Sequence, residues 1–445
     1  MAHSIRLALT NTLADGGYCV RAHVGTHQYA VHLILDTGSS TLAVNHACYR
    51  LESDNHADFT YYTQSINYGV GSWHGPVIKT QVSLGMFGHS VTLPDAYTAI
   101  ADTGKFECFK HADGILGLAY RPLNYAHYLF EAAETQTPKK DVYQYIMSGA
   151  NDNPAYKQTK AVTLPSFFTS LEKQGVVSDK FAFWLHRSSI YYDNGCCRTK
   201  ALAHWQNHGL FVMGEPVMHR DLYREPMLSA KVLHDKFYNV NLLSVKVGER
   251  DVHSAPVLAE KDVTRWCSNA IVDTGATVIG LPVSLYNKVV ESLEKYISDL
   301  SSILEPFSAF SSQEKGIPLA SLTLSNWPTI EFFLEGENGE DVVLTLPPEA
   351  YWQIHAPEFN SASFKIFPLK HWPNQCILGL PLISQYYTIF DRSKGNVGYG
   401  GSDKKESHES ENDKKANGVI TFAEKVTLAS TVNSVKSAFS HHSNK

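Results

Sequence analysis

The sequence lacks any apolar run of the roughly 18 residues that a membrane-spanning helix needs. Residues 1–14 contain one basic residue and only a short apolar stretch, so they also lack the hydrophobic core of a secretory signal. The seven cysteines are an odd number without regular spacing, which is typical of a reduced compartment. We therefore expect a soluble, cytoplasmic protein that does not associate with a membrane.

The sequence also lacks an excess of positive charge. The formal net charge is -6, and no cluster of Arg and Lys is interleaved with aromatics, so nucleic acid is not an expected partner. The motifs His-Glu-x-x-His and Gly-x-Ser-x-Gly are absent, which excludes common zinc and serine hydrolases. Four possible zinc ligands lie close together, but their spacing fits no standard zinc pattern: Cys196, Cys197, His204 and His208. We predict neither a metal nor a cofactor.

The chain of 445 residues is long enough for two lobes and a tail. Short alternating or apolar segments between turn residues, such as Tyr29–Leu35, predict a mainly β fold. We predict an amino-terminal lobe over residues 1–215, with surface insertions at about 135–163 and 188–208, and a second lobe over 216–401. Residues 402–445 are so polar and charged that a disordered tail is expected.

Three segments carry helical patterns. Apolar residues recur at three- and four-residue spacings over Ser284–Leu304, and a shorter helix is predicted over Ser166–Gln174 with Gly175 as its carboxyl-terminal cap. Sparse apolar residues over Val419–Phe439 allow a weak amphipathic helix within the tail, as an alternative to disorder.

One internal repeat stands out. The segments Leu33–Thr41 and Ala270–Val278 each consist of an apolar strand that runs into Asp-Thr-Gly. Each is followed at long range by two apolar residues and a glycine, at 115–117 and 377–379. A lone Asp-Thr-Gly is most often an ordinary turn, but two copies with matching order indicate a repeat of whole lobes.

The repeat predicts a site with two carboxylates, Asp36 and Asp273. Each strand would bury its sides in a lobe core, while the following turn presents one carboxylate to a cleft between the lobes. Two carboxylates held close together share one proton, because both cannot ionise at low free-energy cost. The charged partner can then activate a water molecule while the protonated partner polarises a carbonyl group.

These motifs resemble the pepsin family of aspartic peptidases from Tyr18 to Gly400, most closely over Ala112–Tyr120 and Gln385–Gly400. The resemblance implies two pseudo-symmetric β lobes with a peptide-binding cleft between them. It also implies a hairpin flap over the cleft and an apolar pocket for the residue before the cleaved bond. The residues that match these features are Thr37, Gly38, Ser39, Thr274 and Gly275 beside the dyad, Tyr68, Gly69 and Trp73 in the flap, and Ile34, Phe106 and Ile115 at the pocket.

The sequence departs from the family pattern at two positions of the site. Ala43 stands where most pepsins have a tryptophan that serves the flap tyrosine, and Trp73 is predicted to replace it, in an arrangement similar to that of β-secretases. Ala276 stands where many relatives have a hydroxyl that donates to the second carboxylate. Loss of that donor should raise the pKa of Asp273 and move the working range towards less acidic pH.

Only 35 residues precede Asp36, and they already have the pattern of the first strands, so no inhibitory prosegment is expected. In this respect the sequence resembles the bacterial pepsin homologues called shewasins. We predict a monomeric aspartic endopeptidase that cleaves peptides or proteins between bulky hydrophobic residues. The alternative is a catalytically silent protein that uses the same cleft to bind peptides.

Overall fold

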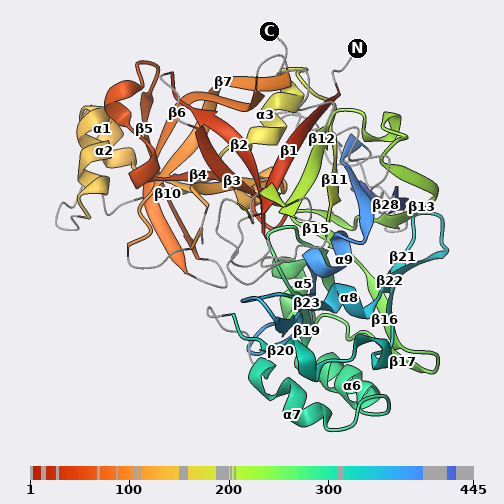
Figure 1. The fold of residues 1–445 in the computed structure, drawn as a ribbon. Helices are drawn as coiled ribbons and strands as arrows, with labels where there is room; N and C mark the ends of the chain where they lie inside the picture. The colour runs from red at the N-terminus through yellow and green to blue at the C-terminus, as the bar shows by residue number, and fades with distance from the viewer. Residues whose placement is uncertain are drawn as a thin grey trace.

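The computed structural model describes most of the chain. The described residues are 4–11, 17–26, 30–67, 71–86, 89–104, 108–109, 112–149, 159–186, 200, 203–204, 207–308, 314–393 and 418–426. They form two lobes built mainly from β-strands, with the amino-terminal half of the chain in red to yellow and the carboxyl-terminal half in green to blue (Figure 1). No helix among these residues is long and apolar enough to cross a membrane.

The amino-terminal lobe is built on a long, continuous sheet. Its strands are β1 (Ile5–Asn11), β2 (Tyr18–Val24), β3 (Ala30–Asp36), β4 (Leu42–Asn45), β5 (Asp58–Asn67), β6 (Ser72–Met86), β7 (His89–Ala101) and β8 (Gly114–Gly117). Buried aliphatic side chains from these strands, such as Leu33, Leu35 and Leu116, form its core. Helix α3 (Phe167–Lys173) has Ser166 as its amino-terminal cap, and Gly175 follows with a φ of 67°, which confirms the helix predicted there.

The carboxyl-terminal lobe contains three smaller sheets. The first sheet has the strand order β14 (His234–Asp235), β15 (Tyr238–Val240), β18 (Ala270–Val272), β26 (Cys376–Leu378), β19 (Ile279–Pro282) and β25 (Ile366–Leu369). The second has the order β17 (Asp251–Ser254), β16 (Leu242–Val247), β21 (Ile330–Glu335) and β22 (Asp341–Leu346). The third has the order β20 (Ile317–Pro318), β24 (Ser361–Phe364) and β23 (Trp352–Ile354). Their helices are α5 (Glu260–Trp266), α6 (Val283–Leu293), α7 (Leu300–Leu304), α8 (Pro348–Tyr351) and α9 (Leu380–Ile383).

The helix predicted over Ser284–Leu304 is wrong in its length. The structure has α6 and α7 with a break between them, at which Asp299 adopts a left-handed conformation with a φ of 57°. Ile297 and Leu300, on either side of the break, are both buried, so the apolar residues keep a helix-like spacing in the sequence although the helix is interrupted. Periodicity alone therefore did not reveal the interruption.

The two lobes repeat one strand arrangement around the Asp-Thr-Gly turns. In the first lobe β3 runs parallel to β8, with Asp36 beside Gly117, and β4 pairs antiparallel with β8. In the second lobe β18 runs parallel to β26, and β19 pairs antiparallel with β26. The bilobal, pseudo-symmetric β fold expected from the repeat is confirmed.

Further strands extend the large sheet towards the second lobe, in the order β1, β12 (His208–Met213), β11 (Lys180–Leu185), β27 (Tyr386–Asp391), β28 (Val419–Lys425) and β13 (Tyr223–Lys231). Strand β28 corrects the expected disordered tail and also the alternative helix over its first residues. Its apolar side chains Val419, Ile420 and Phe422 are buried between β27 and β13. The remaining tail residues, 402–417 and 427–445, lie outside the described residues.

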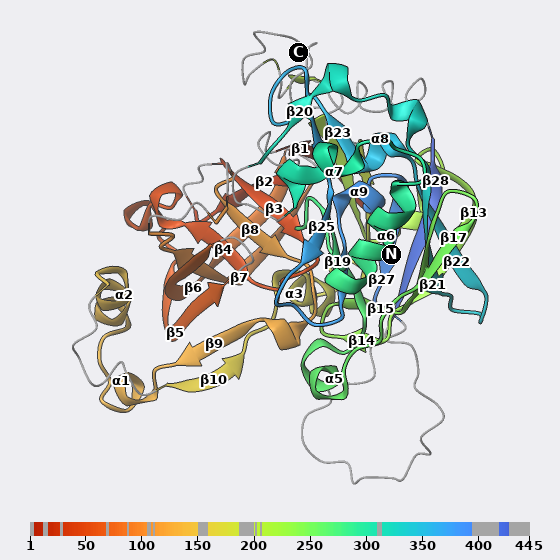
Figure 2. The ribbon, with the colours of Figure 1, turned by 90° about the horizontal axis from the view of Figure 1, so that it is seen from below.

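The predicted insertion at 135–163 also contains regular structure. Strands β9 (Tyr125–Tyr128) and β10 (Lys160–Thr163) form a hairpin, and helices α1 (Phe130–Glu134) and α2 (Lys139–Met147) lie in the connection between them. Figure 2 shows this unit at the outer end of the amino-terminal lobe, beside β5. Strand β10, at the end of the insertion, pairs with β9, and β9 pairs with β5, so the insertion is joined to the sheet and is not only a surface loop.

Candidate active site

The two aspartates of the repeat lie at equivalent strand ends. Asp36 is the last residue of β3, and its main-chain carbonyl accepts a hydrogen bond from Leu118 N at 2.7 Å. Asp273 directly follows β18, and its main-chain N donates to the Leu378 carbonyl at 3.0 Å. Each apolar strand is buried in its lobe, so the next residues are carried to the boundary between the lobes.

The two threonines that follow the aspartates interlock across this boundary. Thr37 N donates to Thr274 Oγ1 at 3.0 Å, and Thr274 N donates to Thr37 Oγ1 at 2.9 Å. Each hydroxyl then donates to a carbonyl of the other lobe, Thr37 to Val272 O at 2.9 Å and Thr274 to Leu35 O at 2.8 Å. Both threonines are buried, so these four hydrogen bonds satisfy groups that water does not reach. The sequence placed both threonines beside the dyad but did not reveal this reciprocal exchange.

The glycines of the two turns show how close the carboxylates are. A Cβ atom on Gly38 would lie 2.6 Å from Asp273 Oδ2, and one on Gly275 would lie 2.4 Å from Asp36 Oδ1. Each carboxylate therefore packs against the glycine of the opposite lobe. Each also accepts a hydrogen bond from the glycine two residues after it, Gly38 N to Asp36 Oδ1 at 2.7 Å and Gly275 N to Asp273 Oδ1 at 2.8 Å.

The electrostatic environment separates the two carboxylates. Burial raises the pKa of Asp36, while the Ser39 hydroxyl, which donates to Asp36 Oδ2 at 2.5 Å, and the Gly38 amide lower it. The pKa of Asp273 is raised well above its ordinary value by burial, by the charge of Asp36 and by the hydrogen bond that the two carboxyl groups share. The donors that oppose this rise are the main-chain amides of Gly275 and Ala276, and Ala276 has no hydroxyl to add. Burial and the neighbouring charge therefore favour the protonated form of Asp273, while the Ser39 and Gly38 donors favour the charged form of Asp36.

Several predicted cleft residues are brought together beside Asp36. Ile34 and Ile115 face each other in the parallel β3 and β8 pair, and both join a hydrophobic cluster with Trp73 and Ala43. Phe109 belongs to the same cluster, with its ring centroid 6.4 Å from that of Trp73, and sequence reasoning missed it. The predicted residues Tyr68, Gly69 and Phe106 lie outside the described residues, so the flap role of Tyr68 and its contact with Trp73 stay predictions.

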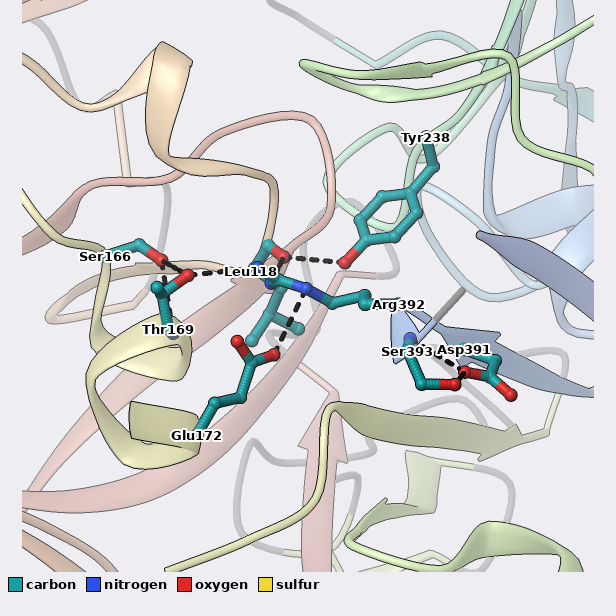
Figure 3. A network of polar contacts seen from close by, with 8 residues as sticks. All are labelled: Leu118, Ser166, Thr169, Glu172, Tyr238, Asp391, Arg392 and Ser393. Carbon is teal, nitrogen blue, oxygen red and sulfur yellow. Dashed lines mark hydrogen bonds and ion pairs between the residues drawn. The ribbon is translucent and has the colours of Figure 1, made fainter. Parts of the chain in front are cut away.

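A buried arginine, Arg392, joins a polar network around the Leu118 carbonyl (Figure 3). Arg392 donates from one nitrogen to Leu118 O at 3.2 Å and from another to Thr169 Oγ1 at 2.9 Å, and its Nε lies 3.2 Å from Glu172 Oε1. Tyr238, which comes from the second lobe, donates to the same Leu118 carbonyl at 2.8 Å. Because Leu118 N donates to the Asp36 carbonyl, this junction connects the Asp36 turn to both lobes.

The described residues contain no group of three or more His, Cys, Asp or Glu side chains that could hold a metal ion. Cys196 and Cys197 lie outside these residues, while His208 begins strand β12. The expectation that the protein needs no metal therefore stays a prediction.

Comparisons with known proteins agree with this geometry. The family model for eukaryotic aspartyl proteases matches residues 17–401. A plasmepsin IV of Plasmodium falciparum is 24% identical over 394 residues, which cover 84% of this chain and 67% of the plasmepsin. A beta-secretase of Strongylocentrotus purpuratus is 23% identical over 415 residues, which cover 87% of this chain and 66% of the secretase. The chain thus belongs to the eukaryotic aspartyl protease family.

Proposed function

We propose that the protein is an aspartic endopeptidase that hydrolyses peptide bonds with a water molecule held between Asp36 and Asp273. The observation that carries the proposal is the interlocked pair of turns, in which two carboxylates face each other in unequal environments. Buried hydrogen bonds hold this geometry before any substrate arrives, which reduces the reorganisation needed during the reaction.

The unequal carboxylates give each one a role. Asp36, charged, takes a proton from the water as its oxygen attacks the scissile carbonyl carbon, and Asp273 gives its proton to the carbonyl oxygen. When the tetrahedral intermediate collapses, Asp36 passes its proton to the leaving nitrogen and Asp273 recovers a proton from the hydroxyl group. The C–N bond breaks, a carboxylic acid and an amine form, and both aspartates return to their starting states.

The proposed substrate is a peptide or protein bound in an extended conformation, with bulky hydrophobic residues on both sides of the cleaved bond. The apolar cluster of Ile34, Ile115 and Trp73 beside Asp36 supports this preference. Sensitivity to pepstatin, action as a monomer, a cytoplasmic location and a likeness to the bacterial shewasins are part of the same proposal and await their own tests.

The test is cleavage of a peptide with apolar residues around one bond, between about pH 3 and pH 7, with and without pepstatin. We expect peptidase activity that pepstatin blocks. We also expect kcat/KM to fall at least about a thousandfold in both Asp36→Asn and Asp273→Asn, because the proposed mechanism uses both carboxylates for general acid-base catalysis. Activity that survives either substitution would reject the mechanism. A well-folded wild type that binds the peptide without cleaving it would instead support the silent binding protein.

A further inference from the structure

A second polar network joins strand β5, in the hairpin of β5 and β6, to the segment that follows the Asp36 turn. In this hairpin Asn67 pairs with Ser72, Ile66 with Trp73 and Gln64 with Gly75. The family resemblance makes this hairpin the flap over the cleft. The network connects the hairpin to the turn that carries Asp36, through side chains for which sequence analysis gave no role.

Gln64 is the hairpin's contribution to the network. Its side chain is 2% exposed, and Nε2 donates to Asn124 Oδ1 at 2.8 Å and to the Tyr125 carbonyl at 2.8 Å. A buried amide on a strand that is otherwise rich in aromatic and hydroxyl side chains is costly unless its hydrogen bonds are made. These two bonds therefore favour one position of the hairpin relative to residues 124–125.

Asn124 is the centre of the network. Its Oδ1 also accepts a hydrogen bond from Thr41 Oγ1 at 3.2 Å, and its Nδ2 donates to Pro165 O at 3.1 Å. Thr41 follows the Asp36 turn closely, and its main-chain carbonyl accepts from Gly117 N at 2.9 Å. Both Thr41 and Asn124 are buried. One side chain thus receives donors from the hairpin and from the segment that leaves the Asp36 turn.

The network lies where the insertion enters and leaves the lobe. Leu164 N donates to the Asn124 carbonyl at 2.9 Å, which joins the two ends of the segment 125–163. That segment, described except for residues 150–158, covers the outer side of β5. Leu129 N donates to Tyr61 O at 2.9 Å, the Tyr61 hydroxyl donates to Thr137 O at 2.8 Å, and the rings of Phe59 and Tyr143 lie 5.3 Å apart.

The opposite side of the hairpin is also held closely. Gly75, which faces Gln64, lies so near to strand β7 that a Cβ atom on it would be 1.9 Å from the Ile100 carbonyl oxygen. His74, the residue before Gly75, donates from its main-chain N to the Asp102 carbonyl at 3.2 Å, and Asp102 N donates to the His74 carbonyl at 2.8 Å. The base of the hairpin is therefore fixed between β7 on one side and the insertion on the other.

We propose that Gln64, through Asn124, is a positioning residue that holds the β5 and β6 hairpin over the Asp36 turn, with the segment 125–163 as a buttress for it. The proposal rests on the proposed function in one respect only, namely that the hairpin covers bound substrate. Gln64 itself does not touch the reacting atoms. Its loss should weaken substrate capture more than the chemical step.

The test compares Gln64→Met with Gln375→Met in the full chain. Gln375 is a matched control in the other lobe: it is fully buried, and its Nε2 donates to the carbonyls of Trp266 at 2.9 Å and Ser268 at 2.8 Å. Both variants lose two buried amide hydrogen bonds and should lose similar thermal stability. In Gln64→Met alone, hydrogen exchange of amides in 58–67 and 72–86 should become about tenfold faster.

Kinetics provide the second readout. Gln64→Met should raise KM for a peptide about fivefold to tenfold and change kcat less than about twofold. Gln64→Glu should show the same defects at pH 7, where a carboxylate would face two acceptors, and recover in part near pH 4, where the protonated acid donates again. If Gln64→Glu only disturbed packing, its KM and its hydrogen exchange would not recover as the pH is lowered.

The outcomes separate the two proposals. Exchange in the hairpin that is unchanged, or that changes equally in Gln375→Met, would overturn the positioning role whatever the activity. A KM equal to that of the control variant would do the same. A wild type without peptidase activity would reject the proposed function, while the exchange comparison would still decide the role of Gln64.

Discussion

The two Asp-Thr-Gly turns share a backbone arrangement but differ in what surrounds each carboxylate. Both turns end an apolar strand, both donate a glycine amide to the carboxylate, and both place their threonine in the same cross-lobe exchange. Asp36 also receives the Ser39 hydroxyl, whereas the corresponding position beside Asp273 is Ala276. The shared features bring the carboxylates together, and the Ser39 hydroxyl lowers the pKa of Asp36 where no corresponding hydroxyl acts on Asp273.

Among variants that keep both aspartates, the largest effect is expected at the two glycines, whose position is shared by both turns. In Gly38→Ala and Gly275→Ala the new methyl group would lie 2.6 Å and 2.4 Å from the opposite carboxylate. Either variant should lose at least about a hundredfold in kcat/KM, because the carboxylate must move from its working position. The control is Gly149→Ala, where a φ of 68° strains the backbone but no atom lies within 4 Å of the new Cβ. Near-normal activity in either site variant would contradict the facing arrangement.

A smaller effect is expected at the threonines. Thr37→Val and Thr274→Val each remove a hydroxyl and leave a buried main-chain N–H of the opposite turn without its acceptor. Each should lower the free energy of unfolding by about 1–3 kcal/mol in denaturant titration. The exposed Thr345→Val on β22 serves as the control and should change little. If the free energy of unfolding falls much more in one of these two variants than in the other, the hydrogen bonds of Thr37 and Thr274 do not contribute equally to stability.

The smallest effect tests the asymmetry itself. Activity should fall as pH rises through the pKa of Asp273, because Asp273 must hold the proton, and Ala276→Thr should lower that pKa by adding a donor to the ionised form. The alkaline limb of the pH profile should therefore move to lower pH by about one unit or less. Ser39→Ala should raise the pKa of Asp36 and move the acid limb to higher pH. If the pH profiles of both variants coincide with that of the wild type, a hydroxyl at position 39 or 276 does not set the pKa values of the two aspartates.

The repeat was sufficient to predict the bilobal fold and to bring Asp36 and Asp273 together, because it contains two local signals at once, an apolar strand and a turn that requires glycine. The catalytic role of the two aspartates stays a prediction. Ile34 and Ile115 were predicted at the pocket and Trp73 in the flap, and the structure has all three in one hydrophobic cluster. The Gln64 and Arg392 networks could not be predicted in the same way. A single polar residue on a strand has no periodic signal, and its partners, such as Asn124 and Leu118, are distant in sequence.

The errors have a physical cause as well. The residues before Val419 are so highly charged that composition masked the short apolar run of β28, although most of its residues are buried and the strand pairs on both sides, with β27 and with β13. The insertion helix α2 buries only Val142 and Tyr143, so its periodicity was too weak to indicate a helix. Both elements are stabilised by tertiary contacts more than by their own sequences.

Strand β28 has a consequence for the order in which the fold is completed during synthesis. It pairs along its length with β27 and with β13, where Tyr223 faces Lys425 across the sheet. During synthesis, β13 leaves the ribosome long before the strand that completes its pairing, and the sheet between the lobes cannot close until β28 follows. Both aspartates are made well before that point. A growing chain would therefore contain both aspartates and the two threonines that bond across the lobes before this part of the sheet is complete, and the pairing of β13 waits until synthesis has passed residue 425.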